Sequence, residues 1–349
     1  MQSQFEIAGR PIGPGYPPYI VAELSANHGG SLDRALDTLA AAKLAGADAV
    51  KLQTYTPDTM TLDVDHADFM IRGGLWDGRK LYELYREAQT PLEWHYKLFE
   101  KARALGITIF STPFDDTAVD FLETLDAPAY KIASFELVDH ALIARVARVG
   151  KPLIMSTGMA SQAEISEAVD AARKAGCRQL LLLHCVSGYP TPADQINLRR
   201  IPALAAESGI PIGLSDHTLG IEVSVAAVAM GACLIEKHFT LARADGGPDA
   251  AFSLEPDEFA GLTQSAASAF AALGNGQPTR SIVEQGSMSF RRSIYVVKDI
   301  APGEVFTTDN LRAIRPGYGL APKYLPEIIG RRASRTLSRG TRLNWDAID

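Results

Sequence analysis

Cysteine is scarce in this chain, and long apolar runs are missing. Three of the 349 residues are cysteines, Cys177, Cys185 and Cys233, an odd number at spacings that match no metal-binding motif. They predict no disulfide framework, so a reducing, cytosolic compartment is expected. No apolar stretch reaches bilayer-spanning length, and the polar start MQSQFEIAGR gives no sign of a signal peptide.

An excess of positive charge is missing as well. The formal net charge is -7, which argues against a nucleic-acid-binding surface. The densest basic cluster is expected to solvate a small carboxyl-terminal fold; it comprises Arg331, Arg332, Arg335 and Arg339. Hydrophobic residues make up 46% and charged residues 21%, proportions typical of soluble globular proteins. Neither a nucleic-acid nor a membrane partner is expected.

Eight apolar, β-prone runs that end in polar residues dominate the sequence. They span residues 20–28, 49–54, 107–114, 129–136, 152–158, 180–190, 211–218 and 234–240. Helical patterns follow them at 31–47, 90–106, 115–125, 139–150, 161–176, 198–209, 220–232 and 255–274. Eight strand–helix pairs predict an α/β fold, a (β/α)₈ TIM barrel over residues 1–274, whose strand ends converge on one mouth. A doubly wound sheet is the alternative, but no glycine-rich dinucleotide fingerprint follows the first strand.

Local signals add detail to this plan. Ser31 is expected to cap the first helix, and Thr90, followed by Pro91 and Glu93, is expected to cap the helix at 90–106. The segment 55–89 is longer than a usual connection between a strand and a helix. A functional lid and a plain surface insertion with a short helix explain it equally well.

The carboxyl-terminal part follows a different pattern. Residues 275–289 are interpreted as a linker, and residues 290–349 contain short strand-like pieces broken by Pro and Gly. A weak internal repeat aligns 299–311 with 336–348. Two similar halves predict a compact β-rich module that is marginally stable alone and should pack on something else.

Two histidines end neighbouring predicted strands. His217 and His238 can share a divalent metal, with Glu23 from the first strand as a carboxylate ligand. The alternative is that both imidazoles bond structurally and Glu23 caps a turn. Two imidazoles and a carboxylate together favour the metal, but the sequence does not choose among Mn²⁺, Mg²⁺, Co²⁺ and Zn²⁺.

Two lysines interrupt apolar strands. Lys51 and Lys131 would be costly to bury without an anion, so they predict a pocket for phosphate and carboxylate groups. Pairing with an interior carboxylate such as Glu136 is the alternative. The surrounding hydroxyls are those of Thr112, Ser134, Ser156 and Ser215. Glu136 is a candidate general base or hydroxyl acceptor. The candidate sugar contacts are Gln53 and Tyr189, and Asp249 is a polar loop residue expected close to the mouth.

At these residues the chain resembles the nonulosonate (sialic acid) synthase family. The matching pieces include AELSANHGGSLDRA, GADAVKLQTYTPDT, YKIASFE, GLSDHTLG, EKHFTL and, beyond the linker, IRPGYG. Eleven such pieces follow the family order over nearly the whole chain. The insertion GGLWDGRKLYELY and the segment IRPGYGLAPKYL resemble the branch that makes pseudaminic acid. Ser187 stands where the sialate branch tends to carry Asn, which leaves the sugar contacts at that position open.

The resemblance implies a barrel followed by an antifreeze-like (SAF) domain, in a cytoplasmic, domain-swapped homodimer. Family members condense phosphoenolpyruvate with an N-acetylated amino sugar and water, giving a nine-carbon α-keto acid and phosphate by C–O cleavage. The acceptor implied here is 2,4-diacetamido-2,4,6-trideoxy-altropyranose, which yields pseudaminic acid. N-acetylneuraminate or legionaminate synthesis is the alternative, and a non-catalytic sugar-binding protein is a more remote one. The pathway context implied is surface or flagellar glycosylation.

The resemblance also assigns residues. The implied metal, Mn²⁺ first with Mg²⁺ or Co²⁺ as alternatives, is bound by His217 and His238 with Glu23 in or near its shell. Catalysis is assigned to Glu136, Glu23 and His238. The phosphoenolpyruvate positions are Lys51, Thr112, Lys131, Ser134, Ser156, Ser187 and Ser215. The sugar positions are Gln53, Tyr189, Asp249, Phe290 and Arg315.

Overall fold

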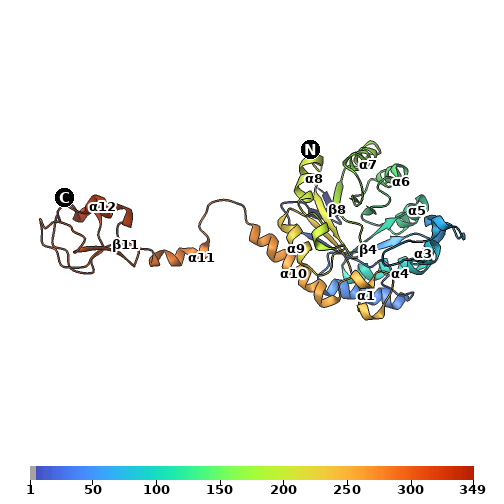
Figure 1. The fold of residues 1–349 in the computed structure, drawn as a ribbon, viewed down its shortest axis with the longest axis horizontal. Helices are drawn as coiled ribbons and strands as arrows, with labels where there is room; N and C mark the ends of the chain where they lie inside the picture. Colours follow the sequence, from blue (N-terminus) through green and yellow to red (C-terminus); the bar gives the residue numbers. More distant parts are fainter. Residues whose placement is uncertain (1–4) are drawn as a thin grey trace. The chain divides into compact units, whose positions relative to one another are not determined.

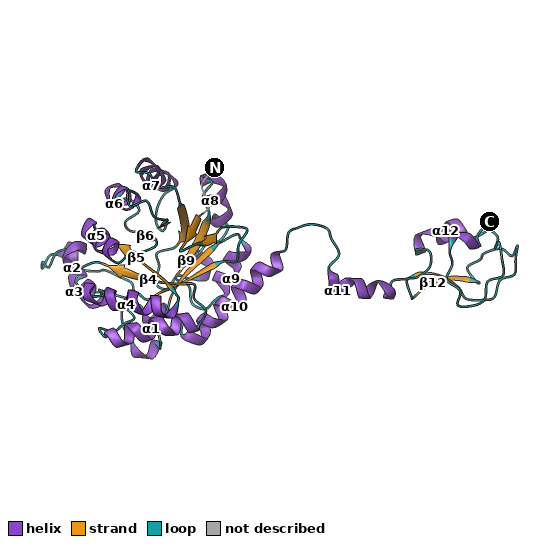
Figure 2. Ribbon diagram, turned by 180° about the vertical axis from the view of Figure 1, so that it is seen from behind, coloured by secondary structure: helices purple, strands orange, loops and turns teal. Residues whose placement is uncertain are grey.

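A computed structural model describes residues 5–349 as two compact units, one ending at Gly274 and the other beginning at Asn275 (Figure 1). In the first unit, helices surround a central set of strands (Figure 2). Among the described residues, no helix combines the length and apolar character that crossing a bilayer requires.

The first unit is built on eight parallel strands that close into a barrel in the order β10-β3-β4-β5-β6-β7-β8-β9. The strands are β3 (Tyr19–Glu23), β4 (Ala49–Thr54), β5 (Thr108–Pro113), β6 (Tyr130–Ile132), β7 (Leu153–Ser156), β8 (Leu180–Cys185), β9 (Ile212–Asp216) and β10 (Leu234–His238). Each begins within one residue of a predicted apolar run. The predicted TIM barrel is therefore confirmed.

Helices follow the strands as predicted. They are α1 (Leu32–Leu44), α4 (Leu92–Leu105), α5 (Asp116–Thr124), α6 (His140–Ala147), α7 (Gln162–Lys174), α8 (Arg200–Ser208), α9 (Glu222–Ala229) and α10 (Pro256–Leu273). Ser31 caps α1 by accepting from the Arg34 N–H, as expected. The predicted Thr90 cap of α4 is wrong. Pro91, with an extended ψ of 135°, is the N-cap and makes no side-chain cap bond, while Thr90 is buried.

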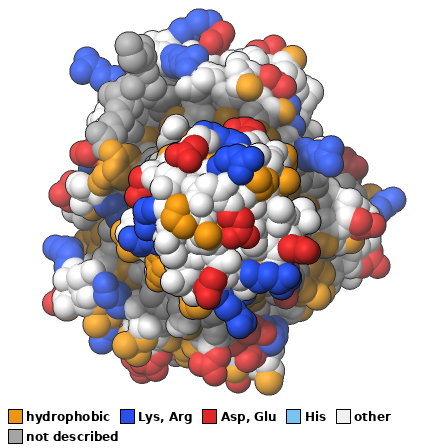
Figure 3. Space-filling model, turned by 90° about the vertical axis from the view of Figure 1, so that its left-hand side faces the viewer, with side chains coloured by type: hydrophobic (Ala, Val, Ile, Leu, Met, Phe, Trp, Pro, Cys, Tyr) orange, Lys and Arg blue, Asp and Glu red, His pale blue; other side chains and the backbone are white. Residues whose placement is uncertain are grey.

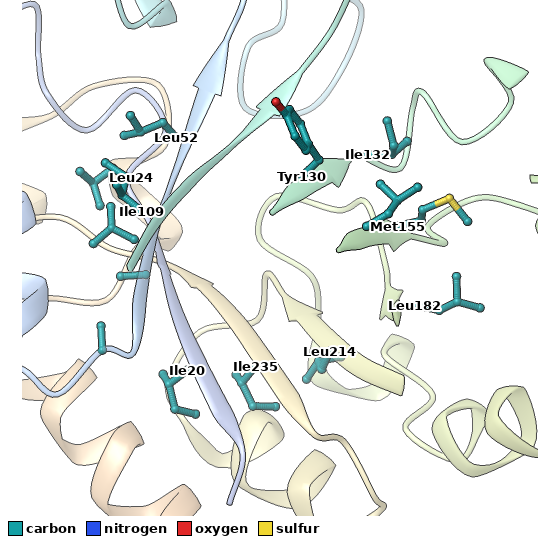
Figure 4. Packing of buried hydrophobic residues seen from close by; sticks show 14 of the residues in the cluster. Ile20, Leu24, Leu52, Ile109, Tyr130, Ile132, Met155, Leu182, Leu214 and Ile235 are labelled. Atoms are coloured by element: carbon teal, nitrogen blue, oxygen red, sulfur yellow. The ribbon is translucent and has the colours of Figure 1, made fainter. Parts of the chain in front are cut away.

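Alternate side chains along each strand pack into two different cores. Side chains such as Ile20, Leu214 and Ile235 pack outward against the helices (Figure 4). Inward residues such as Val21 and Phe110 form a separate buried cluster in the barrel interior. The larger core thus holds the helices on the barrel, and the smaller one fills the barrel below its mouth.

A short hairpin that the sequence did not predict adds to the interior core. Strands β1 (Phe5–Ile7) and β2 (Arg10–Ile12) pair in antiparallel fashion, and their buried side chains join the inward cluster. Ala8 and Gly9, at φ of 49° and 78°, form the connecting turn. Strands of three residues are too short to show a period, which is why sequence reasoning missed them.

The segment 55–89 folds into short elements. It contains α2 (Pro57–Met60), a 3₁₀ turn (Ala67–Phe69) and α3 (Leu81–Ala88). Between them, the backbone returns on itself through a bridge between Met70 and Lys80. The predicted short helix is present, and the turn inside this bridge reaches the barrel mouth, as described below.

The second unit confirms the internal repeat. It contains β11 (Ser293–Val296), β12 (Leu311–Ile314) and α12 (Leu325–Ile328) around its own apolar core. Ile300 and Leu337, equivalent positions of the two half-repeats, exchange both backbone hydrogen bonds at 2.9 Å. The two halves therefore meet about an approximate two-fold axis.

The segment predicted as a linker contains short helical elements. It contains α11 (Ile282–Gln285), begun by a capping box between Ser281 and Glu284, and a 3₁₀ turn at Gly286–Phe290. On the face shown in Figure 3, basic and acidic side chains are interspersed, in line with a solvated surface.

Candidate active site

The carboxyl-terminal ends of the strands bring polar side chains into register. Glu23 lies opposite Lys51 on one neighbouring strand and opposite His238 on the other. Ser215 lies opposite Glu236 in the same way. Paired residues of adjacent strands point to the same face of a sheet, so these side chains share the barrel interior near its mouth.

Two buried lysines and two buried carboxylates alternate in this interior. Lys51 Nζ lies 2.7 Å from Glu23 Oε2 and 3.7 Å from Glu236 Oε1, and it donates to Thr112 Oγ1 at 3.2 Å. Lys131 Nζ donates to Glu236 Oε1 at 3.2 Å. Both lysines therefore have interior carboxylate partners, but these are Glu23 and Glu236 and not Glu136, the example that the sequence suggested.

Glu236 is the site residue that sequence reasoning missed. Its Oε1 also accepts from Ser215 Oγ at 3.2 Å, whereas its buried Oε2 has no hydrogen-bond partner. Burial favours the neutral acid, but Lys131 and Lys51 outweigh burial and lower the pKa of Glu236. Burial raises the pKa of Glu23 and lowers that of Lys131. An anion that enters this pocket would compete with Glu236 for the same ammonium groups.

Three serines, Ser134, Ser156 and Ser187, lie at or just after the carboxyl-terminal ends of β6, β7 and β8. The Gly158 N–H donates to Ser134 Oγ at 3.1 Å, and a Cβ at Gly158 would lie 2.5 Å from Ser187 Oγ. Glycine is therefore what leaves room for both hydroxyls. Ser156 Oγ and Ser187 Oγ are buried without a hydrogen-bond partner. Such unpaired buried groups are rare in proteins and call for a ligand or water.

Glu136 lies in the turn that follows β6. Its Oε2 is buried without a hydrogen-bond partner. Burial raises the pKa of Glu136 to about 7, and nearby Lys131 offsets this only in part. The carboxyl group can therefore gain and lose a proton close to neutral pH, which is what general acid–base catalysis requires.

The two predicted metal ligands are neighbours. The rings of His217 and His238 lie with their centroids 5.5 Å apart. His217 Nδ1 lies 3.0 Å from the Val186 carbonyl oxygen, so its Nε2 is left as the lone-pair nitrogen. His238 Nδ1 is buried without a partner, and burial lowers the pKa of His238 well below its usual value. Burial opposes the charged form of His217, but nearby Cys185 outweighs burial and raises the pKa of His217. The neutral, partly unsatisfied imidazole of His238 suits a metal ion.

The third predicted metal ligand is engaged elsewhere. Besides its contact with Lys51, Glu23 accepts from Gln53 Nε2 at 2.9 Å. Over residues 5–349, no three His, Cys, Asp or Glu side chains come together in a metal-binding arrangement. The donor set that the structure offers is thus the two imidazoles, with Asp249 Oδ2 4.0 Å from His238 Nδ1.

The sugar-side candidates line the same mouth. Tyr189 lies against His217, with ring centroids 4.4 Å apart. Ser25, which sequence reasoning did not select, donates to Asp249 Oδ2 and accepts from Gln53 Nε2 at 2.9 Å. Phe252 packs on both Tyr189 and His238, at 5.2 and 4.8 Å. Aromatic rings beside a few polar groups are typical of a small-molecule pocket.

Phe290 and Arg315, the remaining candidates, belong to the second unit. Both are exposed, Phe290 by 64%. Ser293 Oγ donates to the Pro316 carbonyl at 2.7 Å and accepts from the Gly319 N–H at 2.9 Å, which fixes the loop after Arg315. The Gly317 N–H donates to the Ser289 carbonyl at 2.9 Å, so this loop lies beside the segment that carries Phe290.

The fold and its mouth define a (β/α)₈-barrel enzyme with an appended SAF domain. The chain matches the SAF domain over residues 291–349 and the NeuB family over residues 38–278. The second match covers more than half of the chain, and the chain belongs to the NeuB family.

Its relatives include several synthases of nonulosonic acids. It is 45% identical to the pseudaminic acid synthase of Campylobacter jejuni over 93% of this chain and 95% of that protein. It is 38% identical to the N,N'-diacetyllegionaminic acid synthase of Legionella pneumophila over the full length of both. The fold is also similar to the crystal structure of the N-acetylneuraminic acid synthetase of Leptospira borgpetersenii in complex with citrate. The two chains are 33% identical in sequence and superpose with a TM-score of 0.74. The match covers 83% of this chain and 97% of the Leptospira chain.

Proposed function

We propose that this protein is a pseudaminic acid synthase. It condenses phosphoenolpyruvate with 2,4-diacetamido-2,4,6-trideoxy-altropyranose and water, and it releases pseudaminic acid and phosphate. The observation that carries the proposal is the set of buried polar atoms without partners at one mouth: Ser156 Oγ, Ser187 Oγ, Glu136 Oε2, Glu236 Oε2 and His238 Nδ1. The 45% identity to pseudaminic acid synthases supports the choice of product.

The lysines and serines suit phosphoenolpyruvate. Lys51 and Lys131 would neutralise its phosphate and carboxylate, and the hydroxyls of Ser134, Ser156 and Ser187 would donate to the phosphate oxygens. C3 of phosphoenolpyruvate then attacks the aldehyde carbon of the open-chain sugar. Water adds to the electron-poor C2, and the tetrahedral intermediate expels phosphate by breaking the C–O bond. Throughout these steps the two lysines stay beside the phosphate and carboxylate charges of the substrate. Charged groups that are already in position when charge develops in the transition state lower the barrier most.

The two imidazoles suit a divalent metal, for which we propose Mn²⁺, with Mg²⁺ or Co²⁺ as alternatives. His217 and His238 would hold it, with Glu23 or Asp249 near its shell. A metal bound there would supply Lewis-acid polarisation of an oxygen and orientation of the acceptor. The neutral state of His238 and its unpartnered Nδ1 support this assignment.

Glu136 is proposed as the group that moves protons. In its neutral form it donates a proton to the aldehyde oxygen as the C–C bond forms. As carboxylate it then accepts a proton from the water that adds to C2, which restores the starting state. A pKa of about 7 keeps both forms accessible near neutral pH.

This role predicts a pH dependence. Because the cycle starts from neutral Glu136, kcat/KM should fall as the pH rises through about 7. Glu136→Gln should lower kcat by roughly 10²- to 10⁴-fold and remove this inflection from the residual rate. A Glu136→Gln enzyme with near-normal kcat, or with the same inflection, would contradict the assignment.

Stability gives an independent readout on Glu136. Its pKa is about 7 in the folded protein against an ordinary 4.5, so the ionised form disfavours folding. The stabilising contribution of the neutral acid is complete below pH 4.5 and is lost as the pH rises through 7. Glu136→Gln should therefore be about 1–3 kcal/mol more stable than wild type at pH 8 and equally stable at pH 4.

The acceptor sugar is tested by parallel assays. Phosphate release from phosphoenolpyruvate is measured with the altrose-type diacetamido sugar, with its legionaminate counterpart and with N-acetylmannosamine. Pseudaminic acid synthesis predicts the highest kcat/KM with the first. A preference for another sugar would favour the alternative synthase activities, and no release with any of them would leave a non-catalytic sugar-binding protein.

We further propose a cytoplasmic homodimer in which the second unit of one subunit covers the barrel mouth of its partner. Exposed apolar side chains follow the strands at the mouth, among them Phe135 (58% exposed), Val138 and Leu219. Phe290 is exposed on the second unit. Exposed apolar side chains on both units of the chain suit an interface between copies. Arg315 would then donate to an N-acetyl oxygen of the sugar.

Complementation between inactive subunits tests this arrangement. Arg315→Ala and Lys131→Ala should each be nearly inactive as homodimers. After subunit exchange, heterodimers should regain activity, because one site then combines an intact barrel with an intact Arg315. Arg312→Ala, which removes an exposed arginine of β12, is the matched control and should stay active alone. Verified exchange without recovery would show that Arg315 does not act across subunits.

A further inference from the structure

The segment 55–89 carries a tryptophan to the mouth of the barrel. Trp76 Nε1 donates to the Pro248 carbonyl at 3.0 Å, and the Trp76 ring lies 5.6 Å from the ring of Tyr189. Trp76 therefore joins three loops that are far apart in sequence. This contact favours a functional segment over a plain surface insertion, the two readings that the sequence left open.

The turn around Trp76 is built to hold this position. The Ile71 N–H donates to the Arg79 carbonyl, and the Gly78 N–H donates to the Ile71 carbonyl, both at 2.9 Å. Gly74 and Gly78 take positive φ values of 75° and 79°, which side chains rarely adopt. Most neighbours of Trp76 in the turn are exposed, Leu75 by 48%, whereas Trp76 is half-buried.

Trp76 lies on the sugar side of the mouth. Its aromatic partner, Tyr189, is 4.4 Å from the ring of His217, and its hydrogen-bond acceptor, Pro248, directly precedes Asp249. Tyr189 and Asp249 are both sugar-side candidates. The anion pocket, by contrast, is formed on strands β4, β6 and β10 by Lys51, Lys131 and Glu236.

We propose that Trp76 is a specificity-determining residue that forms the outer wall of the acceptor-sugar subsite. This inference rests on the proposed function. Because the indole N–H is already bonded to Pro248, the ring presents only apolar surface to the sugar. An apolar wall suits the deoxy, methyl-bearing end of a trideoxy diacetamido sugar. A hydroxyl placed there would lose its water without gaining a partner, which is unfavourable.

Steady-state kinetics with each substrate varied in turn test this role. Trp76→Ala should raise KM for the trideoxy sugar by about 10- to 100-fold and change KM for phosphoenolpyruvate less than about twofold. Its preference for the trideoxy sugar over N-acetylmannosamine should fall by a similar factor. Trp76→Phe should retain more of this preference, and Leu75→Ala, in the same turn, should behave as wild type. An unchanged sugar KM, or an equal rise in both KM values, would overturn the inference.

Fluorescence separates this inference from the proposed function. The chain has three tryptophans, so Trp94→Phe with Trp345→Phe leaves Trp76 as the single reporter. Adding the trideoxy sugar should change its emission, and adding phosphoenolpyruvate alone should not. If wild type released no phosphate with any sugar, the proposed function would fail. A sugar-dependent change in emission would then still support Trp76 as a wall of the subsite, and its absence would overturn that role.

Discussion

Lys131→Ala should lower kcat/KM for phosphoenolpyruvate by roughly 30-fold to several thousand-fold, which corresponds to about 2–5 kcal/mol. Lys131 is buried, and its ammonium group contacts Glu236 at 3.2 Å. In the proposed complex it would hold an anionic group of the substrate in the buried anion pocket. Lys51→Ala should have an effect of the same order, because Lys51 Nζ lies 3.7 Å from the same Glu236 Oε1.

A second mutation distinguishes catalysis from folding. Lys131→Ala leaves Glu236 buried with fewer partners, which should cost about 3 kcal/mol of stability. Adding Glu236→Gln removes the buried charge that has lost its nearest lysine, so the double variant should recover thermal stability but not kcat/KM. Lys151→Ala, at the amino-terminal side of β7, is the matched control and should keep wild-type kinetics. Recovery of activity in the double variant, or normal phosphoenolpyruvate kinetics in both single variants, would show that the anion pocket lies elsewhere.

Removal of the metal should abolish turnover. After exhaustive chelation the rate should fall to background, and Mn²⁺, Co²⁺ or Mg²⁺ should restore it. His217→Ala and His238→Ala should each remove most activity and most bound Mn²⁺, measured by metal analysis and electron paramagnetic resonance, while circular dichroism stays unchanged. The barrel should tolerate both changes because the two residues lie at its mouth and not in its apolar cores.

An exposed histidine provides the control for that experiment. His140→Ala, at the first position of α6, should retain both metal and activity. Full activity after verified removal of all divalent metal would contradict the metal assignment. Loss of activity in His217→Ala with unchanged Mn²⁺ binding would restrict the assignment to other ligands.

The barrel and most of its mouth could be predicted because strand periodicity fixes both. A strand such as β10 (LIEKH) alternates between the interior and the helix layer. Glu236 and His238 therefore point inward, and Lys237 points outward to its buried partner Asp216 at 2.8 Å. The same alternation would have identified Glu236. His238 stood out in this run because it ends the strand, whereas Glu236 has no local signal that pairs it with lysines on other strands.

Other features of the structure leave no signal in the local sequence. Contacts between loops, such as those of Trp76 with Tyr189 and Pro248, depend on tertiary packing. The failed cap at Thr90 shows the limit of a local rule, because the backbone at Pro91 already occupies the N-cap position. Ser25 lies in the polar stretch that follows β3, where the sequence offers several residues as equally good site candidates.

The central claim is that phosphoenolpyruvate and a trideoxy diacetamido sugar are joined with C–O cleavage. Mass spectrometry of the products from phosphoenolpyruvate labelled with ¹⁸O at the bridging oxygen, incubated with the altrose-type sugar, tests it most directly. We predict an unlabelled nine-carbon diacetamido α-keto acid and phosphate that carries the label. Label retained in the sugar acid, or no condensation product despite bound metal, would contradict the account.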